Sequence, residues 1–432
     1  MSRRTADERA PELGPEELPQ SQPAAAGEGG RAETLRVVRD PNFAPYFVGN
    51  LVSNSGTWFQ TLAQSLLVFR LTHSTFLLGV VNFAQFAGVF LLAPWAGSAA
   101  DRFDRRRLLI VTQLAASALT ALLALLAWIG AVNAAIVIGI VLLIGLTVAF
   151  GTPAMQALVA SLVPRERLGA AVALNSVTFN VARAVGPALG ALVVATLGIP
   201  VAFALNACSY LVLVAALGRV RARTAQIVST ERPRLRDSIA TVRRSARLAI
   251  LLAIVAVAGV SVDPVTTLSP AYATRIFGTS DTLAGYLIGA FGAGAVTAAF
   301  TIAGRGRSRR RVALTLALLG GGLVGFAVSP SPAVAFAVLV VAGFGYLGTN
   351  TAATTVIHLE TSDAERGRMM ALWSIAFIGS RPLASLVDGA LASAFGVRAA
   401  TLVLSAPALL AAAGMLARAR RIERRSEHPP SG

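Results

Sequence analysis

One charged stretch decides how this chain folds: Gly97-Ser98-Ala99-Ala100-Asp101-Arg102-Phe103-Asp104-Arg105-Arg106-Arg107. The 25 residues from Phe76 to Ala100 contain no charge, and a second uncharged run follows from Leu108 to Ile144. At about 1.5 Å per residue, the first run is long enough to cross a hydrocarbon core about 30 Å thick. The second run is long enough for two crossings. The arginines and aspartates therefore form a tight loop between two membrane helices.

The composition is that of an integral membrane protein. Of 432 residues, 55% are hydrophobic and 14% are charged. The net charge of +17 comes from arginine alone, since the sequence has no lysine, and it indicates the codon bias of a GC-rich bacterium rather than nucleic-acid binding. The single cysteine, Cys208, excludes an intramolecular disulfide and a cysteine metal cluster. The first 40 residues lack a signal-peptide segment, so we expect insertion to begin with the first membrane helix.

The alternation of apolar runs and loops predicts an all-α membrane protein with twelve transmembrane helices. Residues 1–40 are rich in Pro, Glu, Ala and Gly, which predicts a disordered tail. An arginine-rich connector at 219–247 separates six-helix bundles at 41–218 and 248–417, and a basic tail follows at 418–432. The predicted helices are 44–69, 76–100, 108–129, 134–156, 168–194, 200–218, 248–272, 283–303, 312–328, 333–357, 369–393 and 399–417.

The two bundles share a weak internal repeat. Pairs of residues recur 198 or 199 positions apart, and they are Glu166 with Glu365, Arg183 with Arg381, Gly190 with Gly389 and Gly198 with Gly396. Duplicated six-helix halves joined by a hydrophilic connector predict two pseudo-symmetric bundles, as in many secondary transporters.

The arginines predict the orientation in the membrane. Of the 38, 33 lie in the two tails, the connector and the loops after every second helix, whereas Arg70, Arg275 and Arg398 lie on the other side. By the positive-inside rule, both termini and the connector are cytoplasmic in a bacterial plasma membrane. One face of the connector carries apolar residues between arginines, which predicts contact with the anionic inner leaflet.

The charged loop resembles the pattern Gly-x-x-x-Asp-Arg-x-Gly-Arg-Arg between helices 2 and 3 of the major facilitator superfamily. Its matching positions are Gly97, Asp101, Arg102, Arg105 and Arg106, with Asp104 in place of the second glycine. This form is similar to the branch of bacterial siderophore exporters of the enterobactin type. An ordinary positive loop is the alternative. The resemblance implies a cavity lined by helices 1, 4, 7 and 10, and contact of Asp101 with the start of helix 369–393.

A second motif, Gly186-Pro187-Ala188-Leu189-Gly190, resembles the Gly-Pro-x-x-Gly antiporter motif of drug-exporting facilitators. The two glycines permit close approach of another helix. Pro187 cannot donate to the carbonyl of Arg183, so the turn is loosened. We interpret the motif as a hinge or sliding contact, and a packing kink is the alternative.

Polar residues form a stripe on the first helix. Asn50, Asn54, Thr57, Thr61 and Gln64 share one helical face, and such residues must face protein or water rather than lipid. The functional interpretation is the wall of a cavity for substrate, to which Asn82, Gln85, Asn350 and Thr354 contribute. Hydrogen bonding between helices is the alternative.

Four charges lie within the predicted hydrocarbon: Arg183, Asp263, Arg381 and Asp388. Each costs roughly 2.5–3.5 kcal/mol on insertion, so each is expected to have a role, either in a structural ion pair or in handling substrate and protons. Burial makes a carboxyl group able to exchange protons near neutral pH. We favour Asp263 as the proton carrier, because the following Pro264 frees a backbone carbonyl and loosens the helix; Asp388 is the alternative.

Together these features predict a secondary transporter that exports a small organic molecule, such as a drug, siderophore or secondary metabolite, by proton antiport. A proton-coupled importer and a non-transporting membrane sensor are the alternatives. The sequence has no P-loop lysine, no nucleophile with a base and no metal-ligand set, so neither a cofactor nor an enzyme activity is expected. We expect a monomer whose partners are the substrate, protons and the bilayer, without nucleic acid.

Overall fold

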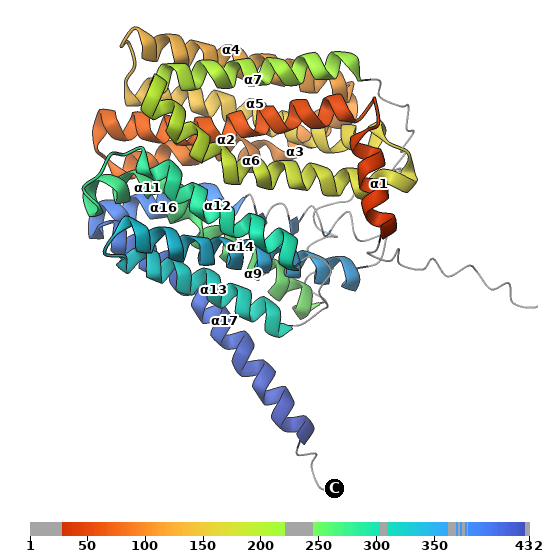
Figure 1. Cartoon of the computed structure of the whole chain (residues 1–432), viewed down its shortest axis with the longest axis vertical. Helices are drawn as coiled ribbons and strands as arrows, with labels where there is room; N and C mark the ends of the chain where they lie inside the picture. Colours follow the sequence, from red (N-terminus) through yellow and green to blue (C-terminus); the bar gives the residue numbers. More distant parts are fainter. Residues whose placement is uncertain are drawn as a thin grey trace, which may run out of the picture.

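The computed structural model describes residues 28–220, 245–302, 309–361, 369, 372–373, 376–377 and 379–427. Within these residues every regular element is a helix, and most helices lie side by side along a common direction (Figure 1). The elements are α1 (Glu28–Val38), α2 (Ala44–Thr72), α3 (Thr75–Arg102), α4 (Arg105–Trp128), α5 (Ala134–Leu162), η1 (Arg165–Arg167), α6 (Leu168–Leu197), α7 (Ile199–Arg219), α9 (Ala246–Ser261), α10 (Asp263–Thr267), α11 (Ser269–Ala271), η2 (Tyr272–Ile276), α12 (Leu283–Ile302), α13 (Arg309–Val328), α14 (Pro332–Glu360), α16 (Ser380–Phe395) and α17 (Val397–Glu427).

Nine helices in the described part of the chain are long and apolar enough to cross a membrane. They are Arg105–Trp128, Ala134–Leu162, Leu168–Leu197, Ile199–Arg219, Leu248–Thr267, Leu283–Thr301, Arg310–Val328, Pro332–Ile357 and Val397–Arg418. The predicted spans at 44–69, 76–100 and 369–393 are not among them. The first carries the polar stripe, and the last is interrupted by residues that are not described, at 370–371, 374–375 and 378. The protein is therefore an all-helical, multi-pass membrane protein.

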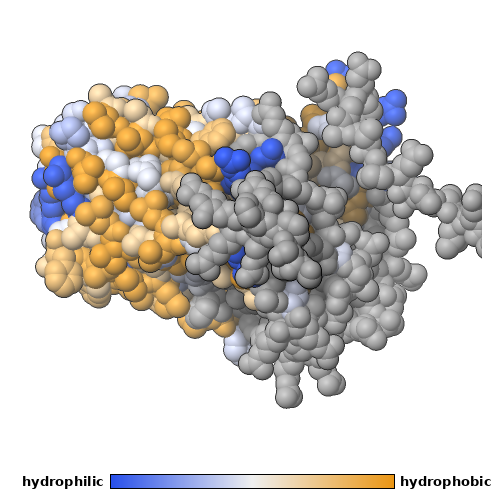
Figure 2. Space-filling view, turned by 90° about the horizontal axis from the view of Figure 1, so that it is seen from below, coloured by the Kyte–Doolittle hydropathy of each residue, from blue (hydrophilic) through white to orange (hydrophobic). Residues whose placement is uncertain are grey.

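Apolar side chains cover much of the surface between the two ends of the helices. Figure 2 shows this face as a nearly continuous hydrophobic area, with hydrophilic residues gathered at its outer edge. Elsewhere in the described helices, large apolar residues such as Leu125, Leu143 and Leu410 are exposed at 57%, 47% and 73%. In water such an area would be unfavourable, whereas lipid tails solvate it.

The helices pack as two halves. Within the first half, α2 packs against α6 and α7, and α5 packs against α3 and α4; within the second, α14 packs against α12 and α13, and α17 against α13. The halves meet along α3 with α16 and along α6 with α12. Figure 1 shows the first half above the second.

Two glycines of the internal repeat occupy equivalent places in the two halves. Gly198 joins α6 to α7 and Gly396 joins α16 to α17, with φ angles of 87° and 88°. Residues with a Cβ rarely adopt this conformation. A glycine thus reverses the chain between consecutive helices without a loop in each half.

Short polar side chains start several helices. Ser74 Oγ accepts from the amide of Leu77 at 3.3 Å, and Asn133 Oδ1 accepts from that of Ile136 at 2.9 Å. Asp104 caps α4, because its Oδ1 accepts from the amide of Arg107 at 2.8 Å. The aspartate that replaces the family glycine therefore fixes the start of α4.

Three segments differ from the sequence-based expectations. The predicted disordered tail at 1–40 is helical over Glu28–Val38, where Val37 is buried in a cluster with Phe43 and Leu174. The predicted helix 248–272 is broken at Val262 into α9, α10, α11 and a π-helical turn, which agrees with the loosening expected from Pro264. The predicted tail at 418–432 continues α17 as far as Glu427, and the connector at 221–244 lies outside the described residues.

One close backbone approach within the first half is between α3 and α5. A Cβ on Gly88 would lie 2.6 Å from the carbonyl oxygen of Gly145, and a Cβ on Gly145 would lie 2.6 Å from that of Gln85. Neither backbone can move away without separating the helices. This contact therefore requires both glycines.

We expect Gly145→Val to lower the free energy of unfolding by about 1–3 kcal/mol, because the side chain would overlap the backbone of α3. Gly139→Val is the matched control on the same helix, since a Cβ at Gly139 meets no atom within 4 Å. Thermal unfolding of both purified variants in detergent measures the difference. Equal melting temperatures would contradict the packing of α3 on α5.

Candidate functional site

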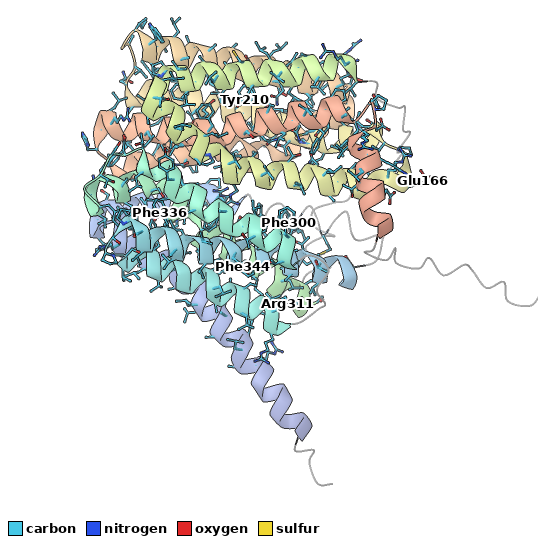
Figure 3. The ribbon with its side chains drawn as sticks, in the orientation of Figure 1. Glu166, Tyr210, Phe300, Arg311, Phe336 and Phe344 are labelled. Carbon is cyan, nitrogen blue, oxygen red and sulfur yellow. The ribbon has the colours of Figure 1, made fainter. Side chains whose placement is uncertain are left out.

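One end of the molecule carries the arginine-rich loops, and we call it the arginine-rich end. It includes the α3–α4 loop, η1 and the start of α13, and Figure 3 shows Glu166 and Arg311 toward this end, away from Phe336. Arg106 ties the α3–α4 loop to α7, since its Nε and Nη2 donate to the carbonyls of Leu217 and Gly218 at 2.7 and 2.9 Å. Arg102 is exposed and Arg105 is half-buried.

The predicted contact of Asp101 with the start of helix 369–393 lies outside the described residues. The backbone of Asp101 belongs to α3, but its side chain is not described, and neither are residues 362–368. Gly97 lies on the same helix, and a Cβ there would meet no atom within 4 Å. The part these two residues play stays a prediction.

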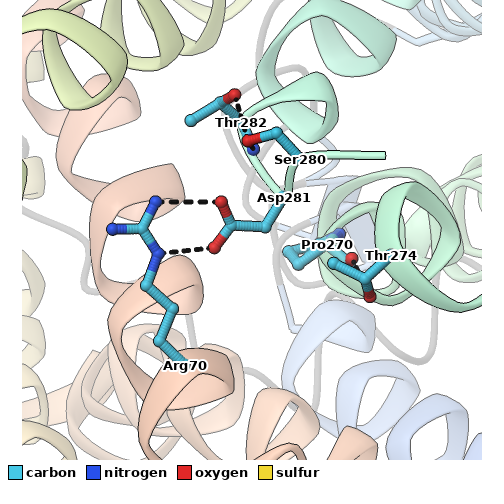
Figure 4. A network of polar contacts seen from close by, with 6 residues as sticks. All are labelled: Arg70, Pro270, Thr274, Ser280, Asp281 and Thr282. Carbon is cyan, nitrogen blue, oxygen red and sulfur yellow. Dashed lines mark hydrogen bonds and ion pairs between the residues drawn. The ribbon is translucent and has the colours of Figure 1, made fainter. Parts of the chain in front are cut away.

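The opposite end, which we call the far end, joins the two halves through charged groups. Arg70 at the end of α2 binds Asp281 in two places, with Nε–Oδ2 at 2.6 Å and Nη2–Oδ1 at 2.9 Å (Figure 4). Arg275 donates to the carbonyl of His73 and lies 5.6 Å from the ring centroid of Phe69. Bidentate arginine–carboxylate pairs fix geometry as well as charge. Charged and aromatic contacts therefore join the two halves at the far end.

Glycines allow the halves to touch near the far end. A Cβ on Gly79 of α3 would overlap the carbonyl of Ser385 in α16, and one on Gly389 would lie 2.8 Å from the carbonyl of Thr75. On α12, a Cβ on Gly285 would lie 2.6 Å from the carbonyl of Pro187. Both contacts between the halves lie in the part of the helices toward the far end.

The Gly186–Gly190 motif lies in α6 between two helices. A Cβ on Gly186 would lie 2.8 Å from Cβ of Trp58, and one on Gly190 would lie 2.7 Å from Cδ2 of Phe59, so both glycines face α2 of the same half. The carbonyl of Pro187 faces α12 of the other half. The motif thus lies where a helix of one half contacts the other half.

Much of the predicted polar stripe is buried and bonded between helices. Gln64 donates to Gln85 Oε1 at 2.5 Å, and Gln85 donates to Thr61 Oγ1 at 2.8 Å, which links α2 to α3. Asn82 donates to Ser65 Oγ at 3.3 Å. These four predicted cavity residues thus form hydrogen bonds between helices, and their contact with a substrate stays a prediction.

The other half of the stripe lies toward the arginine-rich end. Asn50 donates to Asn175 Oδ1 of α6 at 2.9 Å, and Asn54 donates to Asn50 Oδ1 at 2.7 Å. Asn54 and Thr57 remain half-buried, and Thr57 donates to the Tyr210 hydroxyl at 3.3 Å. In α14, Asn350 is buried with its Oδ1 unbonded among the described residues, and Thr354 is half-buried.

The sequence analysis missed a second buried network. Gln60 Oε1 accepts from Thr120 of α4 at 3.2 Å and from Asn206 of α7. Gln60 lies off the stripe, and its partners Thr120 and Asn206 belong to the largely apolar helices α4 and α7. An isolated amide in such a helix is the signal that indicates a bonded partner on a neighbouring helix.

The four predicted charges lie near the boundary between the halves, where α10 packs against α16 and Arg183 of α6 reaches Tyr346 of α14. Asp263 is buried, and it accepts from Thr267 at 2.8 Å through Oδ2 and from Ser385 at 3.1 Å through Oδ1. Asp388, fully buried two turns along α16 from Arg381, has neither carboxylate oxygen bonded within the described part of the chain.

Aromatic rings surround both arginines. Arg183 donates to the Tyr346 hydroxyl at 2.7 Å, and its guanidinium carbon lies 4.6 Å from the Tyr346 ring centroid and 5.3 Å from that of Trp58. The guanidinium carbon of Arg381 lies 5.7 Å from the Trp58 centroid and 5.0 Å from that of Phe86. The ion pairs found among the described residues join Arg70 to Asp281 and Arg167 to Asp40, so none pairs Asp263 with either arginine.

These features define a class of protein: a multi-pass helical membrane protein in two packed halves, with buried charges at the centre. The family model described as "Transmembrane secretion effector" matches residues 32–430, and the chain belongs to this branch of the major facilitator superfamily. Members of the superfamily are transporters and not enzymes.

Relatives and solved structures agree with this membership. The chain is 29% identical to the staphyloferrin A transporter of Staphylococcus aureus over 170 residues, which cover 39% of this chain and 43% of that protein. It is 25% identical to the multidrug efflux pump Tap of Mycobacterium tuberculosis over 86% of this chain and 92% of Tap.

Two structures illustrate the shared fold. A bacterial homologue of the human lysosomal transporter Spinster superposes with a TM-score of 0.71 at 14% identity, covering 91% of this chain and 98% of that one. A D-xylose–proton symporter superposes with a TM-score of 0.67 at 14% identity, covering 87% and 97%.

We expect Asp281→Asn to increase the population of molecules whose far end is open about two- to fivefold, because the variant loses a partly exposed ion pair. Hydrogen–deuterium exchange of the segments around residues 70–75 and 278–284 measures this opening. Asp104→Asn at the arginine-rich end is the control, because asparagine also caps helices. Unchanged exchange at the far end would show that Arg70 and Asp281 do not hold it closed.

Proposed function

We propose that this protein exports a small organic molecule across the bacterial plasma membrane in exchange for protons. The family description and the names of the two relatives, a staphyloferrin A transporter and a multidrug efflux pump, support export of small molecules. The protein acts as a monomer, and α2, α3 and the chain around 369–395 complete twelve spans.

The orientation follows from the positive-inside rule. The arginine-rich end, both termini and the connector at 219–247 face the cytoplasm, where the connector contacts the anionic inner leaflet. The far end then faces outward. The observation that carries the proposal is the contact between the halves at the far end, where Arg70 binds Asp281: an exporter that loads from the cytoplasm holds its halves together on the outer side.

Closing the inner side requires the α3–α4 loop and α6 to move relative to the second half. The contact that holds the halves together on the inner side is formed by the first motif, with Gly97, Asp101, Arg102, Arg105 and Arg106. The contact along which the helices slide is formed by the second motif, with Gly186, Pro187 and Gly190. Support comes from the position of α6, which packs against α2 through its glycines and against α12 through its other face. A helix packed on both halves transmits motion between them.

The proton is carried by the buried carboxyl pair. An ionised carboxylate without donor or cation costs several kcal/mol, so Asp388 is neutral in this conformation. Asp263 differs, because the hydroxyls of Thr267 and Ser385 stabilise its ionised form after a proton leaves. Asp263 is therefore the group that exchanges a proton. The ionised Asp263 in turn keeps Asp388 protonated.

The orientation predicts the labelling of single cysteines in a Cys208→Ser background. Arg223→Cys and Ser426→Cys should react with a membrane-impermeant maleimide only after the cells are permeabilised. Ser280→Cys at the far end should react in intact cells and serves as the positive control. Labelling of either cytoplasmic site in intact cells would reverse the orientation.

Proton antiport is tested in inside-out vesicles with an acid interior, using a pH-sensitive acridine dye. Adding a transported compound should release protons from the lumen and restore dye fluorescence. Asp263→Asn should abolish this recovery while substrate binding to the purified protein is retained, because the amide cannot carry a proton. Glu166→Gln, an exposed site, is the matched control. Full recovery with Asp263→Asn would move the proton to Asp388, and full recovery with both Asp263→Asn and Asp388→Asn would exclude proton coupling through these groups.

A further inference from the structure

Two buried arginines, one from each half, converge on a single indole ring. Arg183 of α6 and Arg381 of α16 lie 5.3 and 5.7 Å from the centroid of Trp58, with exposures of only 7% and 4%. Both are in contact with aromatic rings of the opposite half: Arg183 with Tyr346, and Arg381 with Phe86. The centre of the molecule thus holds two positive charges at the boundary between the halves.

Neither guanidinium has its hydrogen-bonding capacity filled. Arg183 Nη2 and Arg381 Nε are buried without an acceptor among the described residues. The bond from Arg381 Nη2 to Thr266 Oγ1 is long, at 3.5 Å. Buried donors are normally paired, and an unpaired one next to a charge is costly. Among the described residues these donors have no acceptor, and a bound ligand can supply one.

The two aspartates nearby do not fill this place. Both oxygens of Asp263 already accept from hydroxyls, and no ion pair of 4.0 Å or less joins it to Arg183 or Arg381 in the described part of the chain. The aromatic rings stabilise the cations through their faces but offer no carboxylate-like acceptor. The planar fork of a guanidinium matches a carboxylate best, because two parallel hydrogen bonds form.

We propose that Arg183 and Arg381 bind the carboxylate groups of an organic anion beside Trp58. The inference rests on the proposed function and names the substrate class of that transporter. The arginines occupy equivalent positions, 198 residues apart, in the two pseudo-symmetric halves. A ligand with two carboxylates can therefore bond one arginine of each half, whereas a cationic compound would be repelled by both.

The experiment uses two dyes with the same xanthene ring system and opposite charge, carboxyfluorescein and rhodamine 123. Fluorescence anisotropy with the purified full-length protein in detergent gives the affinity for each dye. We expect the wild type to bind carboxyfluorescein at least about tenfold more tightly than rhodamine 123, as for a ligand that gains charge-assisted bonds.

Variants assign the preference to the two arginines. Arg183→Gln and Arg381→Gln should each weaken carboxyfluorescein binding about tenfold or more, and Arg183→Lys should weaken it less because it keeps the charge. Arg398→Gln at the far end is the control and should bind as the wild type does. A wild type that prefers rhodamine 123 or binds neither dye would overturn the proposal, and so would glutamine variants that bind carboxyfluorescein normally.

The preference of the wild type tests the proposal even where a buried variant fails to fold. Binding in detergent needs no gradient, so it also separates this inference from proton-coupled export. Proton release on addition of rhodamine 123 but not of carboxyfluorescein would leave export standing and remove the anion site. Tight carboxyfluorescein binding without any proton release would support the anion site and contradict proton-coupled export.

Discussion

The absence of water from the hydrocarbon core governs this structure, because each polar side chain there must find its partner within the protein. The first half meets this requirement by joining helices through amides and hydroxyls. Gln64, Gln85 and Thr61 link α2 to α3, while Gln60 links α2 to α4 and α7. The described groups left unbonded near the centre, on Arg183, Arg381, Asp388 and Asn350, lie instead close to the boundary between the halves. Where a buried polar group has no partner within the protein, we expect a ligand or a proton to bind.

The seal at the far end is made by backbone contact more than by large apolar side chains. Gly79 lies against Gly389, and Gly285 lies against α6, so the helix axes approach closely over a few residues. Such contacts depend on the fit of two backbones and are lost together when the helices separate. The bidentate pair of Arg70 and Asp281 adds a directional link at the rim, where solvent weakens charge interactions. Such contacts stabilise one arrangement of the two halves and still allow the halves to separate.

Sequence alone predicts the all-helical architecture well, because apolar runs, the arginine distribution and the repeated Gly198 and Gly396 are properties of single segments. The loosened helix at Pro264 is predictable for the same reason. The number of membrane spans is less predictable, because the polar stripe lowers the hydropathy of α2. The stripe itself shows the limit of pattern analysis. Periodicity says that Thr61 and Gln64 share a face, but only packing shows that both side chains bond to Gln85. Likewise, the four buried charges are evident in sequence, whereas the aromatic partners of the arginines are not, because aromatic residues are common in membrane helices and their contacts depend on tertiary structure.

The hydrogen bond from Arg183 to the Tyr346 hydroxyl crosses from one half to the other, at 2.7 Å in a buried site. Rearranging the halves requires that this bond be broken or carried along. Without substrate, this bond therefore stabilises one arrangement of the two halves. A substrate that supplies a replacement acceptor for Arg183 removes that stabilisation. In the proposed antiporter, this bond would limit conformational cycling without substrate, and so limit the leak of protons through an empty protein.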